Sequence, residues 1–301
     1  TGKVMKLCLA KQTNKKINKR SSDWLPFVAP WLIGTLFFFA FPLIYSLILS
    51  VCELENGTMF NFKFEGIKFF KDSLLSDVNY VPKFLDSVET VLINTPLINV
   101  FALGIAMLLN SKIRCRAFFR AMFFLPVMLG TGYIMQQLLG MNVQQETVEM
   151  ARGILLPEGI IQYLGPAVSK YLTMFLDRIT VILWGSGVQI LLYITGLQSV
   201  STSIYEAAQM DAATKWETFW LITLPILAPT ILLNLVYTVI DNYTSSSNAV
   251  IDYILELAFE RSQFELSSAM GWLYFVTCLL FIGIVFLIMR PFVKGVTEEA
   301  L

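Results

Sequence analysis

Two short patterns between Ser203 and Pro225 have the residues of helix capping boxes. Ser203 precedes Glu206 by three residues, and Thr214 precedes Glu217 by the same spacing. In a capping box the hydroxyl accepts a backbone N–H near the start of a helix, and the carboxylate accepts the N–H of the capping residue. The patterns therefore predict two short helices joined by a bend, over residues 204–211 and 215–222.

This predicted helix–turn–helix offers two kinds of contact to another protein. Ala207, Ala208 and Ala212 are small, so a partner surface can approach closely, and Glu206 offers a carboxylate to a partner arginine. Pro225 suits the opening turn of the apolar segment that follows. The alternative is a loop that only links two apolar segments, since capping boxes alone are common.

Polar side chains inside apolar segments form a second candidate site. Such side chains are costly in a bilayer and tend to face a cavity or a neighbouring helix. A neutral sugar favours an aromatic face beside amides and hydroxyls. The candidates for substrate contact are Trp184, Gln189, Tyr193, Thr238, Asp241, Asn242 and Ser245. The last four recur at a spacing that puts them on one helical face. The alternative role is hydrogen bonding and packing between membrane helices.

Six uncharged apolar segments supply the elements that must position these residues. Each has about 20 residues or more, enough to cross a bilayer as a helix. They are residues 24–52, 90–111, 121–145, 179–205, 218–240 and 266–289. We therefore predict an all-α integral membrane protein with six transmembrane helices. The first segment exceeds the 7–15 apolar residues of a signal peptide, so we expect it to be retained.

The distribution of Lys and Arg predicts the orientation. Seven basic residues and no acid occur in residues 1–20, and residues 112–120 hold four basic residues and no acid. Cytoplasmic loops carry such an excess. We therefore expect a basic cytoplasmic tail (1–23), a six-span membrane domain (24–290) and a cytoplasmic tail (291–301). Both termini would lie on the cytoplasmic side of a bacterial plasma membrane, and the loops before the second and sixth spans would lie on its outer side.

Composition excludes several classes of function. The chain has no histidine, which excludes a Ser-His-Asp triad, a histidine-ligated metal and a histidine proton relay. Its four cysteines form no C-x-x-C pattern, and it has no phosphate-binding loop of the Walker type. The formal net charge is zero, so no global field favours nucleic acid. We predict no catalytic residue, no metal site and no cofactor in this chain.

The loop over residues 201–225 closely resembles the EAA loop of binding-protein-dependent ABC importer permeases. Matching positions hold the Glu-Ala-Ala signature and the closing Ile-x-Leu-Pro, although Ala212 replaces the family's glycine. If that position requires a positive φ, alanine costs about 1 kcal/mol or more. The residues predicted to couple to an ATPase are Glu206, Ala207, Ala208, Asp211, Ala212, Trp216, Leu224 and Pro225.

The resemblance extends over nearly the whole chain and is to the carbohydrate-uptake branch of that family. It includes Asn94-Thr95, Phe118-Phe119-Arg120, Phe124-Leu125-Pro126 and Gly196-Leu197-Gln198. It implies the type I ABC importer permease architecture. The partners it implies are a second homologous permease, two ATPase subunits that hold ATP and Mg²⁺, an extracellular solute-binding protein, lipid-anchored or periplasmic, and membrane lipid.

The expected function is therefore ATP-driven import of a sugar or oligosaccharide. One alternative is the same architecture with another solute, such as a polyamine, phosphate or amino acid. Those solutes are charged, whereas the apolar segments carry no charge away from their ends. A second alternative is an ion-coupled secondary transporter, a class that usually shows inverted repeats and intramembrane acids. Neither feature is apparent in the sequence.

Overall fold

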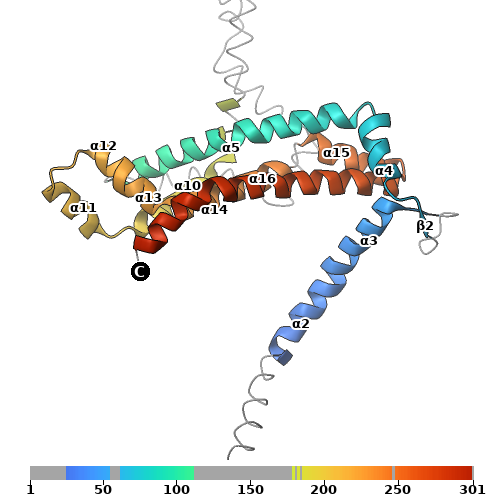
Figure 1. The fold of residues 1–301 in the computed structure, drawn as a ribbon, viewed down its shortest axis with the longest axis horizontal. Helices are drawn as coiled ribbons and strands as arrows, with labels where there is room; N and C mark the ends of the chain where they lie inside the picture. The colour runs from blue at the N-terminus through green and yellow to red at the C-terminus, as the bar shows by residue number, and fades with distance from the viewer. Residues whose placement is uncertain are drawn as a thin grey trace, which may run out of the picture. The chain divides into compact units, whose positions relative to one another are not determined.

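The structure is a computed structural model that describes residues 25–54, 62–111, 178–179, 182–183, 185–245 and 248–299. These residues are mostly helical (Figure 1). Chain contacts divide the protein into two compact units, residues 1–81 with 253–273 and residues 82–252 with 274–301. The predicted basic tail, the basic loop over residues 112–120 and the predicted third span lie outside the described residues.

The first unit opens with a continuous apolar helical run. It comprises α2 (Leu25–Thr35), the π-helical turn η1 (Leu36–Ala40) and α3 (Phe41–Val51). A two-stranded antiparallel hairpin follows, β1 (Cys52–Leu54) and β2 (Phe62–Phe64), and then the short helices α4 (Lys68–Lys71) and η3 (Asp72–Ser76). The hairpin is a small departure from the predicted all-α fold.

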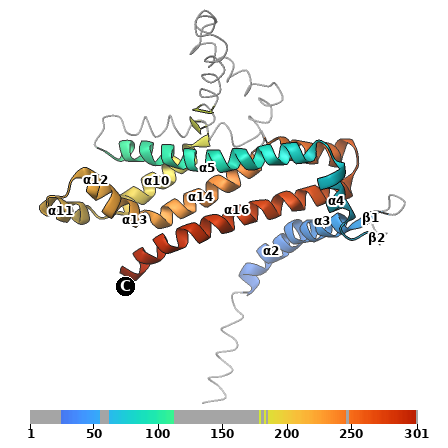
Figure 2. The ribbon, with the colours of Figure 1, turned by 45° about the horizontal axis from the view of Figure 1, so that its top comes forward.

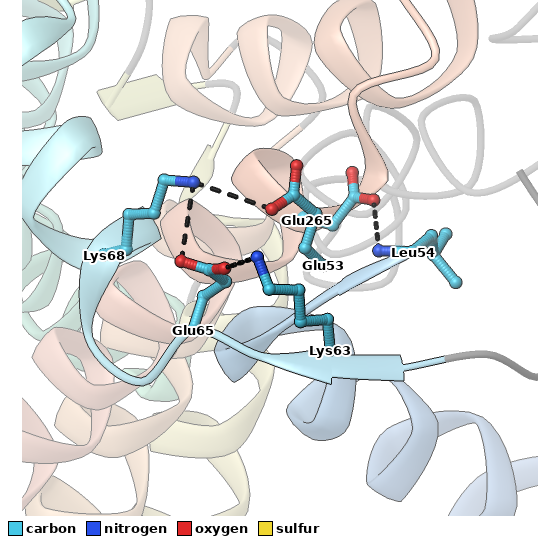
Figure 3. Close-up of polar contacts among 6 residues, drawn as sticks. All are labelled: Glu53, Leu54, Lys63, Glu65, Lys68 and Glu265. Carbon is cyan, nitrogen blue, oxygen red and sulfur yellow. Dashed lines mark hydrogen bonds and ion pairs between the residues drawn. The ribbon is translucent and has the colours of Figure 1, made fainter. Parts of the chain in front are cut away.

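Ion pairs and one backbone contact hold this hairpin together (Figure 3). The Glu65 carboxylate lies 2.8 Å from Lys63 Nζ and 3.6 Å from Lys68 Nζ. The hydrogen bond and charge of Lys63 lower the pKa of Glu65. Lys68 Nζ also lies 3.6 Å from Glu53, and the Leu54 N–H donates to Glu265 Oε1 at 3.1 Å. The hairpin is therefore anchored to the start of the last helix, α16 (Phe264–Glu299).

Asp77 marks the start of the long helix α5 (Tyr80–Asn110). Its Oδ1 accepts the backbone N–H groups of Asn79 and Tyr80 at 2.8 and 2.9 Å, and its Oδ2 accepts the Tyr253 hydroxyl at 2.7 Å. Partial burial raises the pKa of Asp77, but these hydrogen bonds outweigh burial and the pKa lies below its ordinary value. Tyr80 is fully buried and donates its hydroxyl to the Met270 carbonyl at 3.0 Å.

The second unit is built around α5, α10 (Gly187–Ser199) and α14 (Ala228–Thr244). Small residues of α5, Ala102 and Ala106, pack with Ile190, Tyr193 and Leu197 of α10. Between α10 and α14 lie α11 (Thr202–Met210), α12 (Lys215–Glu217), the π-helical turn η4 (Thr218–Thr223) and α13 (Leu224–Ile226). After α14 come α15 (Ala249–Leu255), which begins in the second unit and ends in the first, and η5 (Glu256–Glu260), which belongs to the first unit.

Among the described residues, three helices are long and apolar enough to cross a membrane. They are Phe27–Val51, Tyr80–Asn110 and Phe264–Gly295. A fourth is possible if Lys215–Ile226 and Ala228–Thr244, which meet at a 68° bend, form one broken span. The helices do not start where the apolar segments start. Helix α5 begins ten residues before the predicted second span, because Asp77 accepts the Tyr80 N–H at its start and its first ten residues include three charged side chains, which a search for uncharged segments leaves out.

Candidate functional site

A helical hairpin (residues 201–226) projects from the ends of α10 and α14 (Figures 1 and 2). Its first arm is α11 and its second arm is the continuous helical run α12–η4–α13. The predicted capping box at the second arm is confirmed. The Thr214 N–H donates to Glu217 Oε2 at 2.8 Å, and the Glu217 N–H donates to Thr214 Oγ1 at 3.3 Å. The backbone and hydroxyl hydrogen bonds of Thr214 lower the pKa of Glu217.

The capping box predicted at Ser203 and Glu206 is wrong. Helix α11 already begins at Thr202, with Ser201 as the capping residue, and the Ser201 side chain makes no capping hydrogen bond. The Ser203 hydroxyl instead pairs with the Ser201 hydroxyl. Ser203 therefore lies inside the first turn, and Glu206, in the second turn, is exposed and does not cap the helix.

The bend between the arms is a Schellman motif. The Ala213 N–H donates to the Ala208 carbonyl at 3.0 Å, and the Ala212 N–H donates to the Gln209 carbonyl at 3.1 Å. These two hydrogen bonds define the motif. The residue at the position of Ala212 adopts a left-handed backbone conformation in this motif and is usually glycine. Ala212 has φ of 56°, so this non-glycine residue does occupy the left-handed region.

The outer surface of the hairpin combines charge, small residues and large apolar side chains. Glu206, Ala207 and Asp211 are exposed, whereas Ala208 is buried. Trp216 is 70% exposed, and its ring packs edge-on against Trp220, 5.5 Å between centroids. The other strongly exposed apolar residues here are Met210 and Leu221. Exposed apolar clusters of this kind mark protein interaction sites, and Trp is prominent among binding hot spots.

The second arm extends further than the sequence predicted. Leu224 and Pro225 belong to α13, so Pro225 does not open the following helix. That role falls to Pro229, the second residue of α14, after the bend at Leu227. Residues 218–226 of the predicted fifth span are therefore part of the hairpin. Likewise, Thr202–Tyr205 of the predicted fourth span are part of α11.

An open groove of about 650 Å³ lies between the hairpin and the ends of α5 and α10. Its lining includes Met107, Asn110, Tyr205, Gln209, Lys215 and Phe219. Within the described ranges, no group of three or more acidic or cysteine side chains is placed to hold a metal ion.

A buried polar cluster joins α5, α10 and α14. The Tyr193 hydroxyl donates to Asn99 Oδ1 at 2.8 Å, and Asn99 Nδ2 donates to Thr238 Oγ1 at 3.1 Å. Gln189 Nε2 also donates to Thr238 Oγ1 at 3.4 Å, and Asn234 Nδ2 donates to the Gln189 carbonyl at 3.0 Å. All five side chains are buried, and the amide oxygens of Gln189 and Asn234 have no hydrogen-bond partner within the part of the chain that the structure describes.

The structure separates the predicted substrate residues into two groups. Gln189, Tyr193 and Thr238 belong to the buried cluster. Asp241 is exposed, and Asn242 and Ser245 are half-buried. Asn242 Nδ2 donates to the Thr238 carbonyl one turn below it at 2.8 Å. Trp184 lies outside the described residues.

Asn99 is part of the cluster but was not among the sequence candidates. The available signal was an amide inside an uncharged span, the same signal that identified Gln189. Asn94, one turn and a half earlier in α5, accepts a hydrogen bond from Arg178 Nη1 at 2.7 Å. Amide side chains of α5 therefore hydrogen-bond to Arg178, just before the predicted fourth span, and to residues of the predicted fourth and fifth spans.

The sequence and fold match known transport proteins. Residues 79–298 match the family described as binding-protein-dependent transport system inner membrane component. The chain is 28% identical over 300 residues to a probable ABC transporter permease protein, YesP, of Bacillus subtilis (strain 168), covering 93% of both chains. It is 33% identical over 227 residues to the multiple sugar-binding transport system permease protein MsmF of Streptococcus mutans serotype c, covering 73% of both.

A solved structure extends the match to the fold. A chain of a bacterial alginate ABC transporter in complex with an alginate pentasaccharide-bound periplasmic protein has a TM-score of 0.65 at 19% identity, covering 93% of this chain and 98% of that chain. This chain therefore belongs to the family of binding-protein-dependent transport system inner membrane components, the permease subunits of ABC transporters. It is a transport subunit, and ATP hydrolysis is carried out by a separate subunit.

Proposed function

We propose that this chain is one of two permease subunits in a bacterial importer for a sugar or oligosaccharide, and that the helical hairpin docks on an ATPase subunit. The observation that carries the proposal is the exposed hairpin surface. It places a carboxylate, small residues and two tryptophans on an element that projects beyond the helices (Figure 2). An element that only linked two spans would have no reason to expose Trp216 and Met210.

The chemistry of this surface fits a partner with an apolar groove edged by basic residues. The small side chain of Ala207 allows a partner surface to approach closely, and Trp216 and Trp220 present a large apolar area. Glu206 and Asp211 offer carboxylates to Arg or Lys at the rim, where such pairs set orientation. The ATPase subunits would hold ATP and Mg²⁺, and this chain would contribute the docking element.

The substrate proposal rests on the polar residues of α10 and α14 and on the relatives. MsmF is a multiple sugar-binding permease, and the alginate transporter's periplasmic protein binds a pentasaccharide. Asn242 and Ser245 are half-buried at the far end of α14 from the hairpin, beside exposed Asp241. We propose these residues for contact with sugar hydroxyls, and Trp184 for stacking on a sugar ring. Gln189, Tyr193 and Thr238 would support them through the buried cluster.

We further propose six spans with both termini in the cytoplasm and the tails over residues 1–23 and 291–301. In this orientation the helical hairpin is cytoplasmic and the strands β1 and β2 face the extracellular binding protein. Basic residues before the first helix and over residues 112–120 support this orientation.

Glu206→Ala in the reconstituted complex tests the docking role. Glu206 is exposed and makes no capping contact, so its loss should leave the fold of the chain intact. We expect lower ATP-driven uptake from a panel of labelled mono- and oligosaccharides and a lower ATPase activity when the binding protein is added. Thr244→Ala, at an exposed position on the far end of α14, is the control. Equal loss in both variants would contradict the proposed role.

A further inference from the structure

Gly196 marks the closest approach of α10 to the chain that returns from the hairpin. A Cβ added at Gly196 would lie 2.8 Å from both Oγ1 and Cγ2 of Thr230 and 3.1 Å from Leu227 Cδ2. Real Cβ contacts are essentially never shorter than 3.0 Å. Among the described residues, none has a heavy atom within 4 Å of a Cβ added at Gly104 of α5. The absence of a side chain is therefore required at Gly196 and not at Gly104.

Rotation of the Thr230 side chain does not relieve this contact. A threonine places two heavy atoms in the three staggered positions around its Cβ. Both positions that Thr230 now fills are too close to the added atom. Any staggered rotamer leaves at least one heavy atom in one of those two positions. An alanine in place of Gly196 therefore has to push α10 and α14 apart.

The contact lies where the hairpin joins the transmembrane helices. Gly196 is one turn before the end of α10, and Leu227 is the residue at the 68° bend between the second arm and α14. Leu227 is 1% exposed and packs in the cluster formed by α5 and α10, which includes Leu109 and Leu197. The end of α10, where the chain enters the hairpin, and the start of α14, where it returns, are therefore tightly packed against each other.

Hydrogen bonds continue the connection on both sides of this point. Towards the hairpin, the Tyr205 hydroxyl of α11 lies 3.4 Å from Thr223 Oγ1 on the second arm, and Thr223 is buried. Towards the polar cluster, Asn234 is one turn beyond Thr230 and donates to the Gln189 carbonyl. Sterically fixed and hydrogen-bonded contacts therefore run from the hairpin to the polar cluster.

We propose that Gly196 is a positioning residue: its missing side chain lets Leu227 and Thr230 clamp the helical hairpin to α10 and α14, so that the hairpin and these helices move as one rigid lever. The proposal rests on the proposed docking of the hairpin on an ATPase. Motion imposed on the hairpin would then reach the far end of α14 without being absorbed at the bend.

The rigid lever is tested by the distance between its two ends. Spin labels at Gln209→Cys, on the hairpin, and Thr244→Cys, at the far end of α14, both occupy exposed sites. They are introduced into the assembled complex with the native cysteines replaced. Pulsed electron paramagnetic resonance then measures the distance distribution in the nucleotide-free complex and in the complex trapped with Mg-ATP and vanadate.

We expect one narrow distribution that is the same in both states. With Gly196→Ala added, the distribution should broaden or shift between the states. Gly196→Ala with Thr230→Ala removes both 2.8 Å contacts and leaves the 3.1 Å contact with the end of a leucine side chain. This pair should recover the narrow distribution, and Gly104→Ala should not change it. If Gly196→Ala fails to assemble, Leu227→Ala loosens the clamp from the other side and should broaden the distribution.

Three results would overturn the proposal. They are a distance that changes with nucleotide in the otherwise unaltered complex, a Gly196→Ala distribution like that of the parent, and no recovery in the pair with Thr230→Ala. The Glu206→Ala experiment separates this failure from failure of the docking role. If Glu206→Ala lowers stimulated ATPase activity while Gly196→Ala leaves the distance unchanged, the hairpin docks and only the clamp is wrong.

Discussion

Replacing Ala212 by glycine should stabilise the bend of the helical hairpin. Ala212 has φ of 56° inside a Schellman motif whose two hydrogen bonds fix that conformation. An L-residue other than glycine pays about 1–2 kcal/mol in the left-handed region. Glycine avoids this cost but loses about 0.4–1 kcal/mol because its unfolded chain is more flexible. The difference favours Ala212→Gly by about 0.5–1 kcal/mol.

Hydrogen exchange measures this difference at the bend itself. The amides of Ala212 and Ala213 donate within the motif, so their exchange requires the bend to open. A gain of about 0.5–1 kcal/mol slows their exchange by about two- to fivefold in a peptide covering residues 207–216. Ala207→Gly, in the exposed interior of α11, is the matched control and should speed exchange, because glycine costs about 1 kcal/mol relative to alanine inside a helix.

The reverse substitution tests the same reasoning at a second bend. Gly66 has φ of 64°, and of the described residues an added Cβ there meets only the Phe64 ring, at 3.8 Å or more. Gly66→Ala therefore has room but the wrong backbone, and it should destabilise the turn that joins β2 to α4 by about the amount that Ala212→Gly gains. For Ala212→Gly, the argument from left-handed strain is refuted if the amides of residues 212 and 213 exchange at the same rate as in the parent chain or faster.

Three further predictions concern the substrate site, the first unit and the orientation. Asn242→Ala should lower uptake of the labelled sugar by about fivefold or more, because an unsatisfied hydroxyl costs about 1–3 kcal/mol, and Trp184→Ala should lower uptake strongly because a ring that stacks on the sugar is lost; normal uptake in both would make these residues packing elements. Since the pKa of Asp77 is lowered on folding, its carboxylate stabilises the fold at neutral pH and this is lost as the pH falls below about 4; Asp77→Asn should lower the melting temperature at pH 7 and reduce its acid dependence. An impermeant thiol reagent should label Ser262→Cys and not Ser111→Cys on intact cells, and labelling of the second would overturn the orientation.

The sequence predicts the long helices and the hairpin because both depend on local signals. The apolar runs correspond to α2–α3, α5 and α16, and the Thr214–Glu217 spacing correctly locates the second arm. Helix ends were less predictable. Asp77 begins α5 ahead of three charged residues, which a search for uncharged segments cannot include.

The errors within the hairpin come from patterns with two possible placements. A serine three residues before a glutamate occurs equally well at a helix start and inside its first turn, so Ser203 gave no unique prediction. Pro225 and Pro229 can both open a helix, and the bend at Leu227 selects Pro229 because Leu227 is buried between α5 and α10. Burial of Thr238 depends on Asn99, which lies 139 residues away in the chain. Such long-range contacts leave no pattern in a single sequence.

Site-directed cross-linking tests most directly whether the hairpin docks on the ATPase. Ala207→Cys, exposed at the centre of α11, carries a short photoactivatable or thiol-reactive cross-linker in the assembled complex. We predict a cross-linked product between this chain and the ATPase subunit whose yield changes when Mg-ATP and vanadate are added. Thr244→Cys, equally exposed at the far end of α14, should give no such product. Cross-linking to the ATPase from Thr244→Cys and not from Ala207→Cys would contradict the account.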